Sequence, residues 1–365
     1  MQKSKICFFN SNKEWGGGEK WHFEMACNLF LNDFDILVVA QPKSVLLEKI
    51  KTKGINSKSV KLNNISFLNP IKIFQLVKLF RQNNINILIL NLPSDLKAAG
   101  LAAKIAGVKK IIYRRGSAIA VKNTFINRFY YRKIINFVIA NSKATKNKIL
   151  EKNSNLIANN KIHVIYNGID VKEFDKIISM PERFGNKNEI IIGNLGRLVK
   201  QKAQEYFIDL AFILKEKNIP FKIVIGGDGK RKQDLQAYAK SKNVDDKIIW
   251  VGFVNNVKQF MNSIDVFVLT SFWEGFGYVL AEAMVAKKPV IAFNVSSNPE
   301  LIKDKVNGYL IEPYNISKVA EQIIFIKNNP EKAKELGENG RHFIENDFRP
   351  QDSYSSFVNL ITNFE

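Results

Sequence analysis

The residues best suited to chemistry are two carboxylates, Glu274 and Glu282, which are separated by seven residues near the start of an apolar segment. The composition of residues 278–286 predicts a helix that is apolar on all sides and therefore buried, with Glu282 as its only carboxylate. A lone carboxylate in a buried helix needs a partner that offsets its desolvation. Glu274 precedes the helix in a loop with Gly275 and Gly277, where the backbone can approach a ligand and the helix N-terminus favours anions. Two carboxylates able to accept sugar hydroxyls thus flank a phosphate site, as a nucleotide-sugar site requires.

A pair of cations, Arg197 and Lys202, lies in a second predicted loop. This loop joins a strand that ends at Asn194 to a helix that starts near Ala203. Ligands bind at the carboxyl edge of a parallel sheet, where such a loop lies. A fixed cation beside developing phosphate charge contributes about 3 kcal/mol to stabilisation of the transition state. We therefore assign both cations to a leaving diphosphate, and the alternative is that they are ordinary solvated surface cations.

Two groups of residues in the first half of the chain are candidates for the acceptor side. Gly17 and Gly18 follow the first strand and open the first helix, so backbone amides there could close over a diphosphate or an acceptor. A dinucleotide site is disfavoured, because the spacing is not Gly-x-Gly-x-x-Gly and the second strand ends at Ala40 without an acid. Arg114 and Arg115 end a later strand and could contact a phosphorylated acceptor, or could be ordinary surface cations.

The elements that must position these residues alternate between short apolar strands and helical segments. Strands are expected at 5–9, 36–40, 85–90, 110–113, 137–140, 161–165, 189–194, 221–225, 247–251, 265–270 and 289–293. Continuous apolar strands between helices imply parallel sheets covered on both faces, in an α/β fold of two doubly wound, Rossmann-like lobes with a cleft. We expect a lobe at 1–175, a linker at 176–188, a second lobe at 189–347 and a final helical segment at 348–365.

Four segments, in the same order along the chain, resemble the signature of glycosyltransferase family four, a retaining class with two lobes. They are Asn-Ser at 141–142, Asn-Gly-Ile-Asp at 167–170, Gly-Arg-Leu with a following Lys at 196–202, and the segment with two Glu residues at 274–282. The first 110 residues match only in pattern. The resemblance implies the GT-B fold, with the acceptor bound by the first lobe and the donor by the second. It also implies that the last helix crosses back to the first lobe.

The resemblance assigns roles to individual residues of the donor side. Glu274 would bind hydroxyls of the donor sugar, and Glu282 would bind the ribose diol. Backbone groups of the loop between them would reach the sugar and the diphosphate, namely those of Gly275, Phe276 and Gly277. Gly252 and Phe253, at the end of another strand, would lie beside the nucleobase.

The implied reaction is retaining transfer of a sugar from a nucleoside-diphosphate sugar to a glycan or lipid-linked acceptor, in the synthesis of cell-envelope polysaccharide or lipopolysaccharide. With Arg197, Lys202 and a helix N-terminus serving the diphosphate, no cofactor and no metal is expected. Asp33 and Asp35 have the spacing of a metal motif, but they occupy a predicted turn in which Asp is common. Relatives often carry a histidine near position 114, and this chain does not, which leaves the acceptor side open.

The formal net charge of +21 indicates either a polyanionic partner or a Lys-rich composition that places Lys on every surface. Residues 123–136 form a basic, aromatic helical pattern that could lie on an anionic membrane, although core packing is the more frequent explanation. No apolar run approaches the roughly 18 residues of a membrane span, and no long apolar signal core follows Met1. We therefore expect a cytoplasmic protein, with peripheral contact to the inner membrane face as an option.

Three other functions are compatible with parts of the sequence. A nucleotide-sugar epimerase or phosphorylase could use a similar scaffold, but an epimerase needs acid–base groups at the sugar, and the sequence has no such cluster. A nucleic-acid-binding protein would explain the charge, but it predicts a concentrated basic stripe or a known motif, and neither is evident. A catalytically silent subunit is disfavoured by the intact set of Arg197, Lys202, Glu274 and Glu282.

Overall fold

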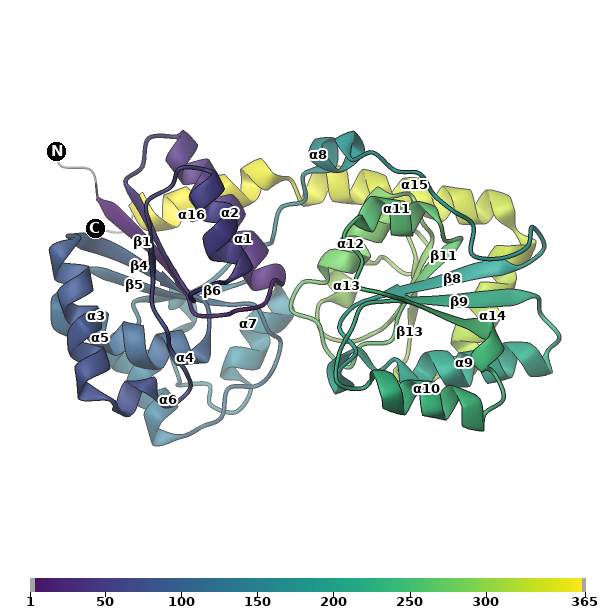
Figure 1. Ribbon diagram of the computed structural model, residues 1–365, viewed down its shortest axis with the longest axis horizontal. Coiled ribbons are helices and arrows are strands. Elements are labelled where there is room, and N and C mark those ends of the chain that lie inside the picture. The colour runs from purple at the N-terminus through teal and green to yellow at the C-terminus, as the bar shows by residue number, and fades with distance from the viewer. Residues whose placement is uncertain (1–3, 363–365) are drawn as a thin grey trace. The chain divides into compact units, whose positions relative to one another are not determined.

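The structure is a computed structural model, and it describes residues 4–362. These residues form two compact units, each with its own sheet and core (Figure 1). Unit 1 contains the chain up to residue 167 and the C-terminal segment from residue 351, and unit 2 contains residues 168–350. Among the described residues, no helix is both long and apolar enough to cross a membrane.

Unit 1 is built on a parallel sheet of seven strands in the order β3-β2-β1-β4-β5-β6-β7. The strands are β1 Lys5–Asn10, β2 Ile36–Ala40, β3 Ser57–Ser59, β4 Ile85–Leu90, β5 Lys110–Arg115, β6 Phe137–Ala140 and β7 Ile162–Val164. The helices are α1 Gly17–Leu31, α2 Val45–Thr52, α3 Pro70–Gln82, α4 Pro93–Asp95, α5 Leu101–Ala106, α6 Phe125–Phe129, α7 Lys143–Leu150 and α16 Pro350–Thr362. Shorter helical segments are η1 Ser66–Leu68, η2 Leu96–Gly100, η3 Tyr130–Ile134 and η4 Asn159–Lys161.

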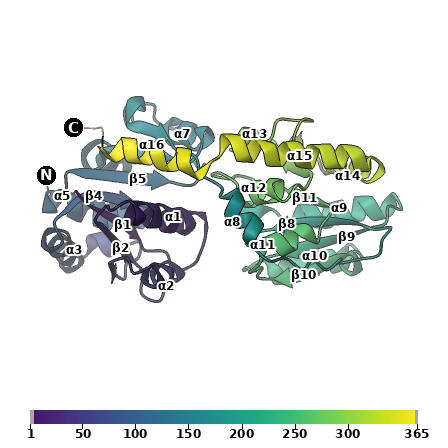
Figure 2. The ribbon, with the colours of Figure 1, turned by 90° about the horizontal axis from the view of Figure 1, so that it is seen from above.

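Each face of this sheet has its own core, because the central strands carry apolar side chains on both sides. On one face α3, η2, α5 and η3 pack against the strands, with Leu76, Phe80 and Tyr130 among the buried residues. On the other face lie α1, α2 and α16. The ring of Phe357 in α16 is fully buried, with its centroid 6.1 Å from that of Phe8 and 5.4 Å from that of Trp21. Figure 2 shows α16 in yellow along unit 1, where it completes the core.

Unit 2 repeats the design with a six-stranded parallel sheet in the order β10-β9-β8-β11-β12-β13. The strands are β8 Ile190–Leu195, β9 Phe221–Gly226, β10 Ile248–Gly252, β11 Val266–Leu269, β12 Val290–Phe293 and β13 Tyr309–Ile311. The helices are α8 Val171–Lys176, α9 Glu205–Glu216, α10 Lys232–Ser241, α11 Val257–Asn262, α12 Tyr278–Val285, α13 Asn298–Leu301, α14 Ile316–Asn328 and α15 Pro330–Asp347. Short turns are η5 Lys200–Lys202 and η6 Asp245–Lys247. The two sheets confirm the predicted α/β class with two doubly wound, Rossmann-like units.

The segment between the sheets is attached to unit 2. The Arg341 guanidinium donates to the Asp175 carboxylate at 2.6 Å, which fixes α8 to α15. Further on, Arg183 donates to the backbone oxygen of Glu189 at 2.6 Å and pairs with Asp265 at 3.3 Å. The structure therefore divides the chain at 167/168, whereas the sequence placed the end of the first lobe at 175 and a linker at 176–188.

Candidate active site

The loop after β8 presents the two predicted cations at the carboxyl edge of unit 2's sheet. Arg197 is exposed, while Lys202 is half-buried at the end of η5. Ala203 then takes a left-handed conformation, with φ of 50°, before α9 begins. A tight turn of this kind sets the direction of Lys202, so that its side chain runs along Gly196, where an added Cβ would lie 3.3 Å from Lys202 Cε.

Lys202 and Glu274, 72 positions apart in the sequence, form an ion pair. The Lys202 Nζ donates to Glu274 Oε1 at 2.6 Å, and the two side chains are only 13% and 8% exposed. Each charge offsets part of the desolvation of the other. The backbone joins the same two loops, because Phe272 N donates to Gln201 O at 2.9 Å. The structure thus brings together a predicted diphosphate cation and a predicted sugar-binding carboxylate.

The loop from Glu274 leads directly into the N-terminus of α12. Gly277 is the N-cap residue with φ of 92°, a conformation that favours glycine, and the helix follows from Tyr278. The Phe276 side chain is buried, with its ring 5.5 Å from that of Phe348, so its aromatic group belongs to the core. The backbone of Gly275, Phe276 and Gly277 therefore stays the predicted ligand-facing part of this loop.

Glu282 lies in the second turn of α12 and is half-buried. Its neighbours in the helix, Ala281 and Ala283, are fully buried. The helix is therefore largely buried, but not on all sides as the sequence predicted, because Glu282 lies on a side that is partly open. Gly252 ends β10 with φ of 69° and open space around it, and the side chain of Phe253 is 72% exposed. The assignments of Glu282 to the ribose and of Gly252 and Phe253 to the base stay predictions.

A glycine-rich loop at 226–229, which the sequence analysis did not single out, supports the loop that carries Arg197. Gly227 has φ of 122°, and a Cβ there would lie 1.9 Å from the backbone oxygen of Gly196. Leu198 N donates to Asp228 O at 2.9 Å, and Gly227 N donates to Gly252 O at 2.6 Å. The signal was present in the sequence as Gly-Gly-Asp-Gly directly after a predicted strand.

In unit 1, Gly17 opens α1 and is exposed, while Gly18 packs close to β4. A Cβ at Gly18 would lie 2.6 Å from Asn91 Nδ2, so only glycine fits there without a shift. The next residue, Glu19, is buried and accepts hydrogen bonds from Asn10 at 3.0 Å and from Asn91 at 3.2 Å. The two glycines thus lie next to a buried polar cluster of Asn10, Glu19 and Asn91 at the carboxyl edge of unit 1's sheet.

Arg114 belongs to this polar cluster and is 1% exposed. Its guanidinium donates to Asn91 Oδ1 at 3.3 Å and to Asn167 Oδ1 at 3.0 Å, and it lies 4.7 Å from the centroid of the Trp21 ring. The guanidinium of Arg115, which is half-buried, donates to the backbone oxygen of Ile119. Both arginines are therefore engaged by the protein, and contact with an acceptor stays a prediction for each.

Asp95 is a buried carboxyl that sequence reasoning missed. It accepts hydrogen bonds from the Ser11 hydroxyl and from the backbone amide of Leu92, the latter at 3.0 Å. Burial raises the pKa of Asp95 from 3.8 to about 7, against the lowering effect of these hydrogen bonds. The available signal was that Asp95 is the single acidic residue between positions 49 and 150.

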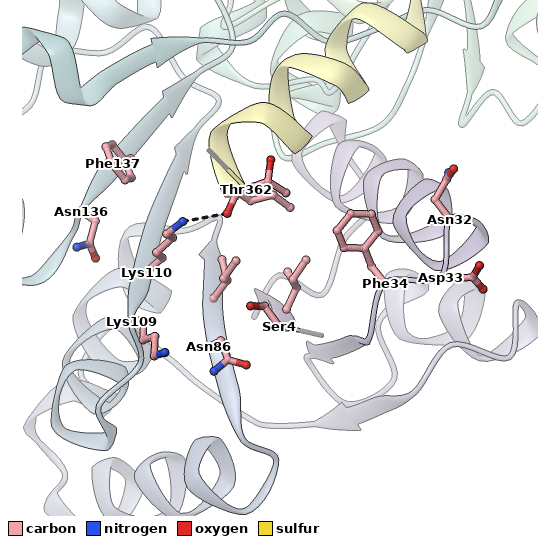
Figure 3. A pocket seen from close by; sticks show the side chains of 13 residues that line it. Ser4, Asn32, Asp33, Phe34, Asn86, Lys109, Lys110, Asn136, Phe137 and Thr362 are labelled. Carbon is pink, nitrogen blue, oxygen red and sulfur yellow. Dashed lines mark hydrogen bonds between the residues drawn. The ribbon is translucent and has the colours of Figure 1, made fainter. Parts of the chain in front are cut away.

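A hollow of about 760 Å³ lies at the opposite edge of unit 1's sheet, where the strands begin (Figure 3). Its lining includes Asn86, Lys110 and Phe137, and Lys110 Nζ donates to the backbone oxygen of Ile361 at 3.0 Å. The described chain ends next to this hollow at both termini, at Ser4 and Thr362. Because ligands of parallel sheets bind at the carboxyl edge, this hollow is not the candidate site.

Within residues 4–362, no cluster of three or more His, Cys, Asp or Glu side chains could hold a metal ion. Asp33 has φ of 60° in the turn after α1, and Asp35 pairs with Lys5 at 3.2 Å. The Asp-x-Asp pair therefore has turn and surface roles in this structure.

Two family models match the chain and together cover most of it. Residues 15–173 match the model described as Glycosyltransferase Family 4, and residues 175–343 match the model described as Glycosyl transferases group 1.

Among curated proteins, an uncharacterized glycosyltransferase of Methanocaldococcus jannaschii is 31% identical over 69% of this chain and 67% of its own length. A Staphylococcus aureus poly(ribitol-phosphate) alpha-N-acetylglucosaminyltransferase is 30% identical over 54% of this chain and 40% of its own length. An Escherichia coli UDP-Gal:alpha-D-GlcNAc-diphosphoundecaprenol alpha-1,3-galactosyltransferase is 27% identical over 73% of both chains. The match spans less than half the length of the staphylococcal relative.

Solved structures share the fold. The Anabaena protein Alr3699/HepE, solved with UDP-glucose, superposes with a TM-score of 0.84 at 19% identity, over 99% of this chain and all of that one. The lipopolysaccharide outer core galactosyltransferase WaaB gives a TM-score of 0.75 at 21% identity, over 98% of this chain and 99% of that one. These likenesses show the GT-B architecture.

Proposed function

Because this chain belongs to glycosyltransferase family 4, we propose that it transfers a sugar from a nucleoside-diphosphate sugar to a glycan or lipid-linked acceptor of the cell envelope. The observation that carries the proposal is the Lys202–Glu274 pair at the carboxyl edge of unit 2's sheet, directly before the N-terminus of α12. A cation, a carboxylate and a helix N-terminus at one edge suit the diphosphate and the hydroxyls of such a donor.

Lys202 and Arg197 would neutralise the charge that develops on the diphosphate as the sugar leaves. Lys202 is already oriented by its ion pair, so little reorganisation accompanies the reaction. Glu274 keeps a second carboxylate oxygen for a sugar hydroxyl while its first accepts from Lys202. Glu282, which lies one helical turn after the start of α12, would bind the ribose diol. These two cations would do at the diphosphate what a divalent metal does in other transferases, and we therefore propose transfer without a metal.

The proposed transfer retains the anomeric configuration. The bond between the anomeric carbon and the phosphate oxygen breaks, and the acceptor oxygen forms its bond to the same face of that carbon. The acceptor proton passes to an oxygen of the leaving diphosphate, so no additional base is needed. Lys202 and Arg197 stabilise that diphosphate in both its developing and its departed forms.

The setting we propose is the synthesis of polysaccharide or lipopolysaccharide at the cytoplasmic face of the membrane. The names of two relatives support this setting. The name of the Escherichia coli relative includes diphosphoundecaprenol, a lipid-linked acceptor, and the name of the staphylococcal relative includes poly(ribitol-phosphate). On this chain, unit 1 would bind the acceptor, with Gly17, Gly18 and the surroundings of Arg114 and Arg115 as the candidate region.

The test is a turnover assay with matched variants, in buffer containing EDTA. Nucleoside diphosphate release is measured for the wild type, for Lys202→Ala and for Lys200→Ala, which removes an exposed lysine from the same turn. We expect Lys202→Ala to lower turnover about a hundredfold and Lys200→Ala to leave it unchanged.

The product separates the proposal from its rivals. Nuclear magnetic resonance of the product should show a new glycosidic linkage with the anomeric configuration of the donor. An epimerised nucleotide sugar would instead indicate an epimerase, and an inverted linkage would contradict retention. Equal losses in Lys202→Ala and Lys200→Ala would contradict the site.

A further inference from the structure

No basic stripe stands out in the order of Lys and Arg along the chain, but the acidic residues are so unevenly distributed that the net positive charge lies almost entirely in one segment. Of the 55 Lys and Arg residues, 21 lie within residues 49–150, together with one of the 34 Asp and Glu residues. That segment therefore has a net charge of +20, and the rest of the chain has a net charge of +1. Its one acid, Asp95, is fully buried, so this segment contributes no acidic side chain of its own to the surface. The whole segment belongs to unit 1.

The same part of unit 1 exposes an unusual amount of apolar surface. Of the 20 large apolar side chains that are exposed among the described residues, nine lie between positions 65 and 129. They are Ile65, Leu68, Ile71, Phe74, Ile105, Ile119, Phe125, Ile126 and Phe129. Phe74 is 68% exposed and Phe125 is 76% exposed. Single exposed apolar residues are common, but a group of them on one surface usually marks a site that binds another molecule or a membrane.

Seven of these side chains belong to η1, α3, α5 and α6, and the other two lie in adjoining loops. Together with η2 and η3, α3 and α5 cover one face of the sheet. In Figure 1, α3, α5 and α6 all lie on that side of unit 1. Lys97 in η2 links them, because its Nζ lies 5.3 Å from the centroid of the Phe67 ring and its backbone oxygen accepts from Tyr130 at 2.7 Å. We call the outer surface of η1, α3, α5 and α6 the basic apolar face.

The helix at 125–134 shows how one segment serves both core and surface. Tyr130, Tyr131 and Ile134 are buried, which satisfies the core-packing explanation of its apolar pattern. Phe125 and Phe129, in the preceding turn, are exposed at 76% and 40%. Core packing therefore accounts for only half of this helix.

We propose that the basic apolar face binds the surface of an anionic lipid bilayer. Lys and Arg side chains would remain at the level of the lipid headgroups, while Phe74, Phe125 and their neighbours enter the boundary with the acyl chains. The exposed cations of the face include Lys78, Arg81 and Lys104. Binding of this kind goes beyond the proposed function, because it requires no donor or acceptor.

A polyanion in water, such as a nucleic acid or a phosphate polymer, fits the observations less well. A phosphate polymer would satisfy the charge but would leave the exposed apolar side chains in water. A single-stranded nucleic acid could stack its bases on the three phenylalanines of the set but would leave its six Ile and Leu side chains in water. A bilayer with anionic headgroups offers both chemistries on one surface. The number and exposure of the apolar side chains therefore favour the bilayer.

The experiment is vesicle flotation of the full chain with two pairs of variants. The vesicles contain phosphatidylcholine alone, or phosphatidylcholine mixed with phosphatidylglycerol. The aromatic variant is Phe74→Ser with Phe125→Ser, and its control is Ile178→Ser with Met180→Ser, two equally exposed apolar residues of unit 2. The charge variant is Lys78→Gln with Lys104→Gln, and its control is Lys217→Gln with Lys240→Gln, which are exposed in unit 2.

We expect the wild type to float with the anionic vesicles and not with the neutral ones. The aromatic and charge variants should each bind about tenfold more weakly, while both controls bind as the wild type does. Equal melting temperatures would show that the variants are folded. Nucleoside diphosphate release without vesicles should be the same in all five proteins, so a failure of membrane binding is distinguishable from a failure of the proposed function.

Two results would overturn the proposal. One is that the wild type does not bind anionic vesicles. The other is that the aromatic variant binds vesicles as tightly as the wild type and both bind soluble polyphosphate equally well, which would make the face a site for polyanions.

Discussion

Lys202 and Glu274 are coupled because neither charge can be removed without leaving the other in a largely dry place. Their side chains are 13% and 8% exposed, and the nitrogen and oxygen are 2.6 Å apart. Arg197, in contrast, is exposed. The proposed donor site therefore combines one largely buried, paired cation with one exposed cation.

Breaking the pair from one side should destabilise unit 2. We expect Lys202→Met or Glu274→Gln alone to cost about 3 kcal/mol, and the double variant to cost less than the sum, because no unpaired buried charge remains. Denaturant unfolding of the four proteins gives the coupling energy. Additive losses would mean that the ion pair contributes nothing as a pair.

The buried carboxyl of Asp95 makes stability depend on pH in a definite direction. Its pKa of about 7 in the folded chain lies above its ordinary value of 3.8, so the folded state holds the proton more tightly than the unfolded state. Its stabilising contribution is complete below about pH 4 and is lost as the pH rises through about 7.

The variant Asp95→Asn should remove this part of the pH dependence. Melting temperatures measured between about pH 4 and pH 8 should fall more steeply for the wild type than for the variant. Identical slopes in the two proteins would show that Asp95 does not hold a proton in this range.

Some of these residue contacts could be predicted and others could not. The roles of Glu274 and Lys202 followed from their places beside a predicted helix and strand, but no spacing pattern predicts that two side chains 72 positions apart form a pair. The burial of Arg114 could not be predicted from the sequence either, because its partners Asn91 and Asn167 come from distant segments.

The loops at the carboxyl edge of unit 2 are packed backbone against backbone. Gly227 lies so close to Gly196 that a methyl group would overlap its carbonyl oxygen, whereas Gly252 has open space around it. Both have positive φ, at 122° and 69°. Substitutions at the two positions therefore separate the effect of close packing, which applies only to Gly227, from the effect of backbone strain, which applies to both.

We expect Gly227→Ala to weaken donor binding and to cost on the order of 3 kcal/mol of stability, because the loop that carries Arg197 must move. Gly252→Ala should cost about 1 kcal/mol, from backbone strain alone. Calorimetric titration with the donor and denaturant unfolding measure the two effects. Equal losses in both variants would contradict the packing argument.

Strands with long apolar runs, such as β2 and β4, were predictable because burial on both faces selects apolar residues at every position. The edge strands β3 and β13 were not predicted. Each has only three residues, and β3 is the polar, largely exposed segment Ser57–Ser59. Its pairing with β2 comes from the neighbouring strand and not from its own composition.

Each unit of the chain carries a complete core, but the core of unit 1 is closed by a helix from the far end of the sequence. Phe357 in α16 is fully buried between Phe8 and Trp21. The overall charge is also unequal between the parts of the chain, since nearly all of the excess lies within residues 49–150 of unit 1. The net charge of the whole chain does not reveal this distribution.

Removing the Phe357 side chain should therefore weaken unit 1 selectively. We expect Phe357→Ala to cost about 4 kcal/mol and to lower one of two calorimetric transitions, while the other is unchanged. The control Phe325→Ala, at an exposed site in unit 2, should leave both transitions near their original temperatures. A shift of both transitions by the same amount would show that the units do not unfold separately.

The most direct test of the donor site is a melting-temperature panel with UDP-, GDP-, ADP- and CMP-sugars, each with Mg²⁺ or with EDTA. A ligand that binds only the folded state must raise the melting temperature. We predict that sugars of one nucleotide raise it for the wild type and for Lys200→Ala, equally with Mg²⁺ and with EDTA, and that the rise is much smaller for Lys202→Ala. No rise with any nucleotide sugar, or a rise that Lys202→Ala leaves intact, would contradict the assignment of the donor site to Lys202 and Glu274.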